Sequence, residues 1–274
     1  MYTEAPSYIK SLQVFQSAGM KLLGVNMDRE GIQYWNAVLE RRSGEDALLY
    51  TIPTFQNPTG VVMSEMRRKE LFKFCMDNRL PIIEDDAYGD IWLDEEPPRS
   101  LKSMDENGMV LYLGTVSKVL APGLRIGWIV GAESVVERLG DVKMQMDYGA
   151  SSVSQWIVKA VLSSPQYDLY LEGMRESLKS RRNLMIEALE KYFKSIADWQ
   201  IPQGGFYIWL NLKHNVAMDQ LFHLALKERI LLNLGSIYDF RKNNALRLSY
   251  SYIDEEEIMV SIEKLSQVVQ RLQS

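Results

Sequence analysis

The sequence predicts an α/β protein, with a large domain over residues 1–150, then connecting helices and a smaller α+β domain over residues 151–274. Two observations predict this class. In the first half, short apolar patterns typical of strands alternate with amphipathic patterns typical of helices, which favours a mostly parallel sheet covered on both faces. From about Glu133 onward, long helical patterns lead into a smaller region of mixed strands and helices.

The elements of the large domain follow from local signals along the chain. Pro6 and Ser7 open a predicted helix that Gly19 closes, and Ser64 is the predicted N-cap of a later helix. Helices are expected over residues 7–18, 34–42 and 65–78. Apolar runs bounded by polar residues predict strands over residues 21–25, 47–53, 81–85, 110–115 and 125–131.

The second half is expected to be mainly helical before the small mixed domain begins. Helical patterns cover residues 144–152, 154–162, 167–193 and 218–229, and a last helix starts at Asp254. Strand patterns cover residues 206–212, 230–234 and 245–251. The aromatic side chains of FYIWL at 206–210 are expected in the core rather than in a binding pocket.

The bulk composition argues against several classes of function. The net charge of −5 and the pI of about 5.3 speak against nucleic-acid contact by this chain, because such contact depends on clustered Lys and Arg. No apolar run reaches the roughly 18 residues that a membrane-spanning helix needs. Residues 1–10 lack the basic start and apolar core of a signal peptide, so a cytoplasmic protein is expected.

The few cysteine and histidine residues argue against a metal site and against Cys–His or Ser–His catalysis. Cys75, the single cysteine, lies in the pattern LFKFCMDN and is expected on the core face of a helix. His214 and His223 lie far downstream, without the spacing of zinc ligands. No metal is expected.

Polar residues gather where the predicted strands end. In an open α/β sheet, ligands bind just beyond the carboxyl ends of the strands, so these residues are expected to share one rim. The rim residues are Asn57, Asp85, Tyr88, Thr115, Ser117, Lys118 and Arg125. The sequence therefore predicts a polar site at that edge of the sheet.

This set of residue types suits pyridoxal 5'-phosphate (PLP). The cofactor needs a lysine amine for a Schiff base and a carboxylate that keeps its pyridine nitrogen protonated. It also needs hydrogen-bond donors for its phenolic oxygen, and hydroxyls with an arginine for its phosphate. The predicted rim offers each of these groups.

Three segments resemble the signature segments of fold-type-I PLP-dependent aminotransferases of class I/II. They are QNPTG, IIEDDAYGD and GTVSKVLAPGLRIGW, and the resemblance runs from about Tyr8 to the C-terminus, including NALRLSYS. The sequence is most similar to 2-aminoadipate or kynurenine-type aminotransferases and to the aminotransferase-like domain of MocR/GntR-type regulators. The resemblance implies PLP as cofactor, the fold-type-I large domain with a smaller C-terminal domain, and a homodimer.

The resemblance also implies a role for each candidate residue. Lys118 would hold the cofactor as a Schiff base and move the substrate proton. Asp85 would pair with the pyridine nitrogen, and Tyr88 with Asn57 would bind the phenolic oxygen. The phosphate would be held by Thr115, Ser117 and Arg125. Arg247 would bind the substrate α-carboxylate, and Asn57 is the second substrate-binding candidate.

The same resemblance predicts an N-terminally truncated large domain. Members of the family normally carry roughly a hundred further residues before the point that matches Tyr8, in keeping with the usual size of a domain. That stretch includes a glycine-rich turn at a helix N-terminus that binds the phosphate, and an aromatic residue that stacks on the pyridine ring. Neither feature is found upstream of Asn57, so weak or no transaminase activity is expected.

Three functions remain open at this point. The leading hypothesis is an aminotransferase that moves an amino group from an α-amino acid to a 2-oxo acid. The alternative is the PLP-binding effector domain of a MocR/GntR-type transcriptional regulator, in which another segment contacts DNA. A fragment with a structural or vestigial role is the third.

Overall fold

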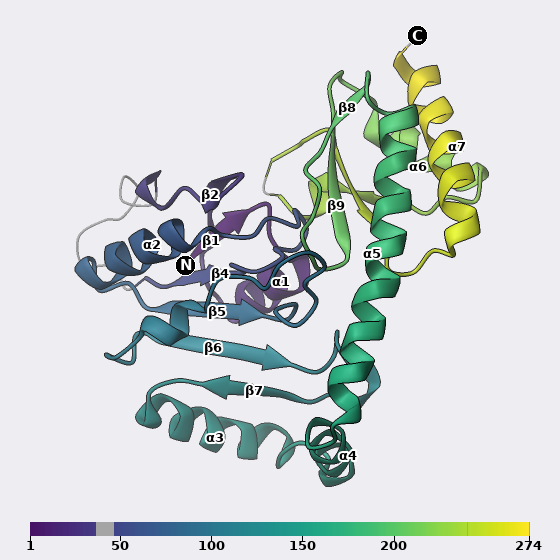
Figure 1. Cartoon of the computed structure of the whole chain (residues 1–274). Helices are drawn as coiled ribbons and strands as arrows, with labels where there is room; N and C mark the ends of the chain where they lie inside the picture. Colours follow the sequence, from purple (N-terminus) through teal and green to yellow (C-terminus); the bar gives the residue numbers. More distant parts are fainter. Residues whose placement is uncertain (37–46, 240, 274) are drawn as a thin grey trace.

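The computed structural model describes residues 1–36, 47–239 and 241–273, which form two sheets joined by one long helix. Figure 1 shows the larger sheet at the centre and the smaller one at the upper right. Helix α5 (Gln166–Tyr192) runs between the two sheet regions. The fold class predicted from the sequence is confirmed.

The larger sheet is mostly parallel, as predicted. Its strand order is β3-β2-β1-β4-β5-β6-β7. The inner pairs are parallel, whereas β2–β3 and β6–β7 are antiparallel. The strands are β1 (Tyr2–Ala5), β2 (Leu23–Asp28), β3 (Gly31–Ile32), β4 (Leu49–Thr51), β5 (Ile82–Asp86), β6 (Val110–Thr115) and β7 (Gly127–Val130).

Strand β1 was not predicted, although it lies in the middle of the sheet. Its sequence YTEA carries Thr3 and Glu4, which break the apolar run expected of a central strand. Both side chains are nevertheless fully buried. The strand is defined by pairing on both sides, with Tyr2 opposite Leu23 and also opposite Leu49.

Helices cover the two faces of the larger sheet. Helix α2 (Glu65–Asp77) packs Leu71 and Cys75 on one face, which confirms the core position expected for the cysteine. Helix α1 (Ile9–Ser17) packs on the opposite face, where Phe15 contacts Tyr50. The predicted cap of α2 is also confirmed, because the Ser64 side chain accepts a hydrogen bond from the backbone N–H of Arg67.

Of two further helix predictions, one is wrong and the other lies largely outside the residues that the structure describes. The helix expected over 144–152 is wrong: α3 (Glu133–Asp147) ends there, and α4 (Ser152–Leu162) begins a new helix. The cause is a left-handed turn at Tyr148 and Gly149, which stops a helix. The helix expected over 34–42 begins as a short 3-10 turn (Tyr34–Asn36), and the rest lies outside the described residues.

The smaller sheet is antiparallel, in the order β10-β11-β9-β8. Its strands are β8 (Ala197–Asp198), β9 (Tyr207–Leu212), β10 (Asn233–Leu234) and β11 (Ala245–Ser249). Helices α5, α6 (Met218–Lys227) and α7 (Glu255–Gln273) pack their apolar faces on it. The strands predicted over 230–234 and 245–251 are shorter than expected, the one over 206–212 agrees to within one residue, and β8 was not predicted. The division at residue 150 stays a prediction.

Backbone hydrogen bonds tie the smaller sheet region to the larger one. The N–H of Gly205 donates to the carbonyl oxygen of Ile91 at 2.8 Å, and that of Leu93 donates to Gln203 at 2.8 Å. The apolar core of the smaller region also includes Phe55 and Tyr88 from the larger one. This contact brings β9 and β11 over the carboxyl ends of β4 and β5.

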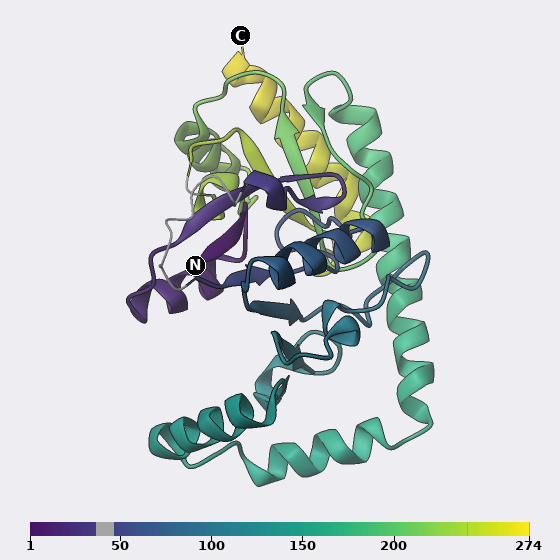
Figure 2. The same cartoon turned by 90° about the vertical axis from the view of Figure 1, so that its left-hand side faces the viewer.

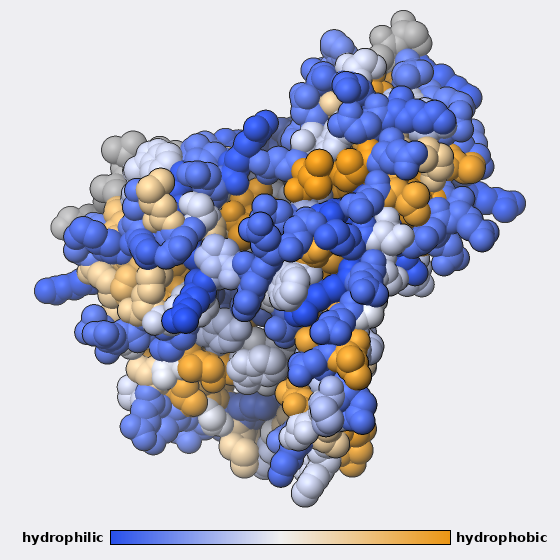
Figure 3. All heavy atoms as spheres, viewed as in Figure 1, coloured by the Kyte–Doolittle hydropathy of each residue, from blue (hydrophilic) through white to orange (hydrophobic). Residues whose placement is uncertain are grey.

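The edge of the larger sheet formed by β7 and α3 is far more exposed than the strands at the centre of that sheet. Every residue of β7 is exposed, and α3 has no buried residue. Figures 1 and 2 both place α3 and α4 together beyond the sheet. Apolar side chains, orange in Figure 3, show over α4 and the adjoining end of α5, where Trp156 and Leu169 are exposed. No helix in the described part of the chain is long and apolar enough to cross a membrane.

Candidate functional site

The carboxyl ends of three parallel strands bring the candidate residues to one rim. Asn57 follows β4, Asp85 lies near the end of β5 with Tyr88 just beyond, and Thr115 ends β6. Lys118 follows three residues later, in the turn that leads to β7. The rim predicted from the strand ends is therefore present in the fold.

Asn57 joins the two sheet regions at this rim. It is almost fully buried, and its Nδ2 donates to the Tyr88 hydroxyl at 3.2 Å. Its Oδ1 accepts a hydrogen bond of 3.0 Å from the guanidinium of Arg247, which lies in β11. Three predicted residues from distant parts of the chain thus form one hydrogen-bonded group. Burial, with the neighbouring Tyr207, raises the pKa of Tyr88, so its phenol stays protonated.

The guanidinium of Arg247 contacts two aromatic rings and keeps one N–H donor available to a ligand. It lies over the rings of Tyr207 and Tyr238, at 3.9 and 4.7 Å from their centroids. Its Nε is buried and has no hydrogen-bond partner within the described residues. A planar, charged donor fixed in this way is suited to a carboxylate ligand.

Asp85 carries a buried carboxyl group that accepts a hydrogen bond from the neighbouring strand β4. Its Oδ2 accepts a hydrogen bond of 2.5 Å from the hydroxyl of Tyr50. Burial raises the pKa of Asp85 and the nearby Asp86 adds to this, whereas the Tyr50 hydrogen bond and the charge of Lys118 lower it. Lys118 is therefore close enough to act on Asp85 electrostatically. Its own ammonium group has no hydrogen-bond or ion-pair partner in the described part of the chain, so it is available to a ligand.

The predicted phosphate residues lie together on the side of the rim next to β7. The hydroxyls of Thr115 and Ser117 are 2.9 Å apart, and Thr115 also contacts the carbonyl oxygen of Ile126. Arg125 has a left-handed backbone after the 3-10 turn Pro122–Leu124, and its exposed side chain makes one long bond to Pro122. The three groups share a region, but no protein contact holds the arginine against the two hydroxyls.

Sequence reasoning missed several aromatic residues of the site. Tyr8, at the start of α1, is half-buried, and its pKa is raised by burial, Tyr207 and Asp85 and lowered by Arg247 and Arg125. It therefore faces both sides of the rim. Tyr207 was expected in the core but contacts Arg247. The buried core residues of that strand are Ile208, Leu210 and Leu212. The period-two alternation of β9 could have separated the two faces.

A buried polar network supports the loop that carries Asn57. The Glu4 carboxylate accepts hydrogen bonds from the hydroxyl of Thr51, from the Ile52 N–H and from Gln56 Nε2. The Gln56 side chain also accepts from the N–H and hydroxyl of Thr59. The loop is closed by Gly60, which has a φ of 72° and lies so near the Tyr207 carbonyl that a Cβ would stand 2.9 Å from it.

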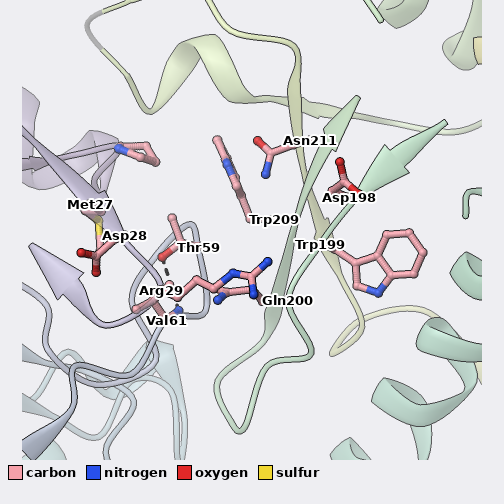
Figure 4. A pocket seen from close by; sticks show the side chains of 11 residues that line it. Met27, Asp28, Arg29, Thr59, Val61, Asp198, Trp199, Gln200, Trp209 and Asn211 are labelled. Atoms are coloured by element: carbon pink, nitrogen blue, oxygen red, sulfur yellow. Dashed lines mark hydrogen bonds between the residues drawn. The ribbon is translucent and has the colours of Figure 1, made fainter. Parts of the chain in front are cut away.

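A separate groove lies on the far side of this loop. It measures about 340 Å³ and lies between the end of β2 and the smaller sheet, with the indoles of Trp199 and Trp209 and the side chain of Arg29 around it (Figure 4). Thr59 borders it, whereas Lys118 does not. Within the described residues, no group of three or more His, Cys, Asp or Glu side chains could hold a metal ion.

Comparison with known proteins gives two kinds of similarity. Residues 2–265 match the family described as aminotransferase class I and II. Among solved structures, the kynurenine aminotransferase of Pyrococcus horikoshii superimposes with a TM-score of 0.92 at 31% identity, over 98% of this chain and 69% of that one. The α-aminoadipate aminotransferase LysN of Thermus thermophilus gives 0.92 at 30% identity, over 100% and 71%.

The more similar sequences are named as regulators. The HTH-type transcriptional regulator YisV of Bacillus subtilis is 49% identical over 98% of this chain and 56% of its own length. The regulator YdfD of the same organism is 48% identical over 100% of this chain and 57% of its length. The chain thus spans a little over half the length of these relatives.

Proposed function

The chain belongs to the aminotransferase class I and II family, and on that premise we propose that it is the PLP-binding effector domain of an HTH-type transcriptional regulator. The observation that carries the proposal is the 48–49% identity with two such regulators over nearly the whole chain. DNA contact would fall to the helix-turn-helix part to which those names refer. The net charge of −5 is consistent with that division of roles.

The residues at the rim fit PLP. Within the described residues, one carboxylate oxygen of Asp85 and the amine of Lys118 have no hydrogen-bond partner, and Tyr88 with Asn57 offers hydrogen-bonding groups beside them. Thr115, Ser117 and Arg125 offer hydroxyls and a cation for a phosphate. Tyr8 supplies an aromatic side chain at the rim. When bound, PLP would supply an aldehyde and an electron-withdrawing ring.

The proposed roles follow from these positions. Lys118 would hold the cofactor through its side-chain amine, the group that reacts with an aldehyde. Asp85 would face the ring nitrogen and favour its protonated form; burial raises the pKa of this carboxyl group, and the hydrogen bond from Tyr50 opposes that rise. Arg247 and Asn57 bind the α-carboxylate of an amino acid. We therefore propose an α-amino acid as the effector that reaches Lys118.

Amino-group transfer is the second candidate, because the same group of residues serves both functions. As a catalyst, Lys118 would move a proton at the substrate α-carbon, while Arg247 and Asn57 would bind the carboxylate as in the sensor. Turnover is therefore the property that distinguishes the two. Similarity to two solved aminotransferases at 30–31% identity supports this candidate.

The test is capture of PLP on Lys118. The purified chain is mixed with PLP, its visible absorption is recorded, and borohydride is added before peptide mapping. We expect a visible band and a phosphopyridoxyl group on Lys118, both absent in Lys118→Ala. Lys143→Ala is the matched control, because Lys143 is an exposed lysine paired with Asp147 on α3.

A second step separates sensor from enzyme. The PLP-loaded chain is incubated with a panel of α-amino acids and pyruvate, and 2-oxo acid formation is followed. A spectral change that saturates without multiple turnovers supports the effector domain, whereas sustained oxo-acid production supports the aminotransferase. A wild-type chain that shows no band and no trapped lysine contradicts both.

A further inference from the structure

Two neighbouring aspartates on β5 each accept a hydrogen bond from one tyrosine, but on opposite faces of the sheet. Side chains alternate along a strand, so Asp85 and Asp86 point to different sides. Tyr50 of β4 donates to Asp85 at 2.5 Å, and Tyr112 of β6 donates to Asp86 at 2.9 Å. The strand register agrees: Tyr50 is opposite Ile83, and Tyr112 is opposite Glu84.

The hydroxyl of Tyr50 takes part in a short relay. It is 2.9 Å from the hydroxyl of Ser11 on α1 as well as 2.5 Å from Asp85 Oδ2. A phenol has one hydrogen, and an ionised carboxylate can only accept. Tyr50 must therefore donate to Asp85, and Ser11 is left to donate to Tyr50. The ring of Tyr50 is fully buried. It contacts the ring of Phe15, which lies on α1 like Ser11, in an edge-on arrangement with 5.1 Å between the ring centroids.

We propose that Tyr50 is a positioning residue for the cofactor carboxylate: with Ser11 it occupies Asp85 Oδ2 and leaves Oδ1 to face a protonated ring nitrogen. The inference rests on the proposed function, since it assigns Asp85 a cationic partner in PLP. It adds a residue that touches neither cofactor nor substrate. It also makes α1 part of the support of the site, because Ser11 lies on that helix.

Physical reasons favour a positioning role. Oδ1 of Asp85 has no protein partner among the described residues, so one oxygen is bound and the other is free. Burial raises the pKa of Asp85 and so disfavours its ionised form. A charge-assisted hydrogen bond to Oδ2 opposes this by stabilising the ionised carboxylate. It also fixes the rotation of the carboxyl group, so the free oxygen has one orientation. A carboxylate without this bond would more readily take up a proton and lose its attraction for a cation.

A purely structural role is the competing explanation, and Tyr112 supplies the matched control. Tyr112→Phe removes the same kind of bond to the adjacent aspartate, on the face away from Tyr50. Phenylalanine keeps nearly all of the buried volume, so both variants are expected to fold. The experiment compares wild type, Tyr50→Phe and Tyr112→Phe by PLP titration, by the pH titration of the visible band, and by thermal unfolding without PLP.

We expect Tyr50→Phe to weaken PLP binding by about tenfold, since hydrogen bonds to charged groups contribute about that much. Its visible band should also titrate at a different pH, while borohydride still fixes the cofactor on Lys118. Tyr112→Phe should stay within about twofold of wild type in affinity and leave the band unchanged. Ser11→Ala should weaken binding in the same direction as Tyr50→Phe, by less.

The outcomes separate the two proposals. If wild type binds PLP on Lys118 and Tyr50→Phe matches it in affinity and pH titration, the positioning role is wrong and the proposed function stands. Equal losses in Tyr50→Phe and Tyr112→Phe also overturn it, because a structural role would then explain both. If wild type itself captures no PLP, the proposed function falls and this inference falls with it. If Tyr50→Phe does not fold, Ser11→Ala decides by the same measurements.

Discussion

The two halves of the candidate site differ in how the protein holds them. Asn57, Tyr88 and Arg247 are joined by hydrogen bonds, and Asp85 is joined to Tyr50. On the other side of Lys118, the exposed Arg125 makes one long bond of 3.4 Å to a backbone carbonyl. The first group, called the carboxylate half, is thus joined by hydrogen bonds between side chains. In the second group, the proposed phosphate half, Thr115 and Ser117 bond each other, but the described residues hold Arg125 only by this one long bond.

The difference follows from what lies beneath each half. The carboxylate half stands on β1, β4 and β5, which are covered by α1 on one face and α2 on the other. The phosphate half stands next to β7 and α3, whose residues are all exposed or only partly buried. Buried polar groups must be satisfied inside the protein, so burial itself orders the first half. Exposed groups can be satisfied by water and need no fixed arrangement.

The largest expected effect concerns the support of the carboxylate half. Arg68 is almost fully buried and donates to the carbonyl oxygens of Met63, Pro53 and Arg99 and to Thr54 Oγ1. Arg68→Met would leave these buried acceptors unpaired and lower the free energy of unfolding by about 3–5 kcal/mol. Denaturant titration measures this.

Arg138→Met on α3 is the matched control for that variant. Arg138 is exposed and its nearest carboxylate oxygen, on Asp141, is 4.0 Å away. Its removal should change the free energy of unfolding by less than about 0.5 kcal/mol. Equal losses in the two variants would remove the distinction between the buried half and the flank.

The second effect concerns Arg247, the proposed donor to the carboxylate of an amino acid. Arg247→Lys removes the planar fork and its stacking on Tyr207, so the affinity of the PLP-loaded chain for α-amino acids should fall by about tenfold or more. The saturation of the spectral change during amino-acid titration measures it. Arg241→Lys, an exposed arginine bonded to Asn26, should leave that affinity unchanged. If PLP binding falls as much as amino-acid binding, Arg247 does not act on the carboxylate alone.

The third effect is a pH dependence of stability that arises in the buried half. Burial raises the pKa of Glu4 to about 7, against the lowering effect of its hydrogen bonds from Thr51 and Gln56. Between about pH 4.5 and 7 the folded chain then holds a proton that the unfolded chain has released. The free energy of unfolding should therefore fall as the pH rises through this window.

Glu4→Gln tests this by removing the titrating group. The fall in the free energy of unfolding should become shallower by up to about 1.4 kcal/mol per pH unit. Part of the fall should remain, because burial raises the pKa of Glu84 to about 7 as well. Glu65→Gln, on the exposed surface of α2, should keep the wild-type slope between pH 5 and 7. A Glu4→Gln curve parallel to wild type would show that Glu4 does not titrate there.

The smallest expected effect concerns Arg125, in the proposed phosphate half of the site. Arg125→Ala should weaken PLP binding by about five- to tenfold, because it removes one solvent-exposed cation from the phosphate. Binding of pyridoxal, which has no phosphate, should be unchanged, and added salt should reduce the difference. Equal effects on PLP and pyridoxal would assign Arg125 a structural role instead.

Local patterns predicted much of this architecture. The apolar run at 110–115 forms strand β6 over the same residues, and Ser64 caps α2, because these signals act within a few residues of each other. Strand ends likewise indicated Asn57, Asp85, Tyr88 and Lys118, since parallel strands in one sheet end on the same side. Their roles toward PLP remain proposals.

Other features could not be found from local pattern. Strand β1 carries the buried Glu4, whose cost is offset by donors from Thr51, Ile52 and Gln56, some fifty residues away. Tyr50 looked like one more apolar strand residue, and its bond to Asp85 depends on the pairing of β4 with β5. Tyr207 lay in an aromatic run, and its contact with Arg247 depends on the pairing of β9 with β11 in the smaller sheet.

The sequence by itself determined the fold class, the family resemblance and the residue types at the rim, because strand and helix periodicity and short motifs are local properties. The tertiary structure decided which of these residues meet. Arg247 and Asn57 are 190 positions apart and share a hydrogen bond because β11 is packed over the end of β4. It also decided that the carboxylate half is buried and bonded while the phosphate half is open, since burial depends on every element packed around a residue.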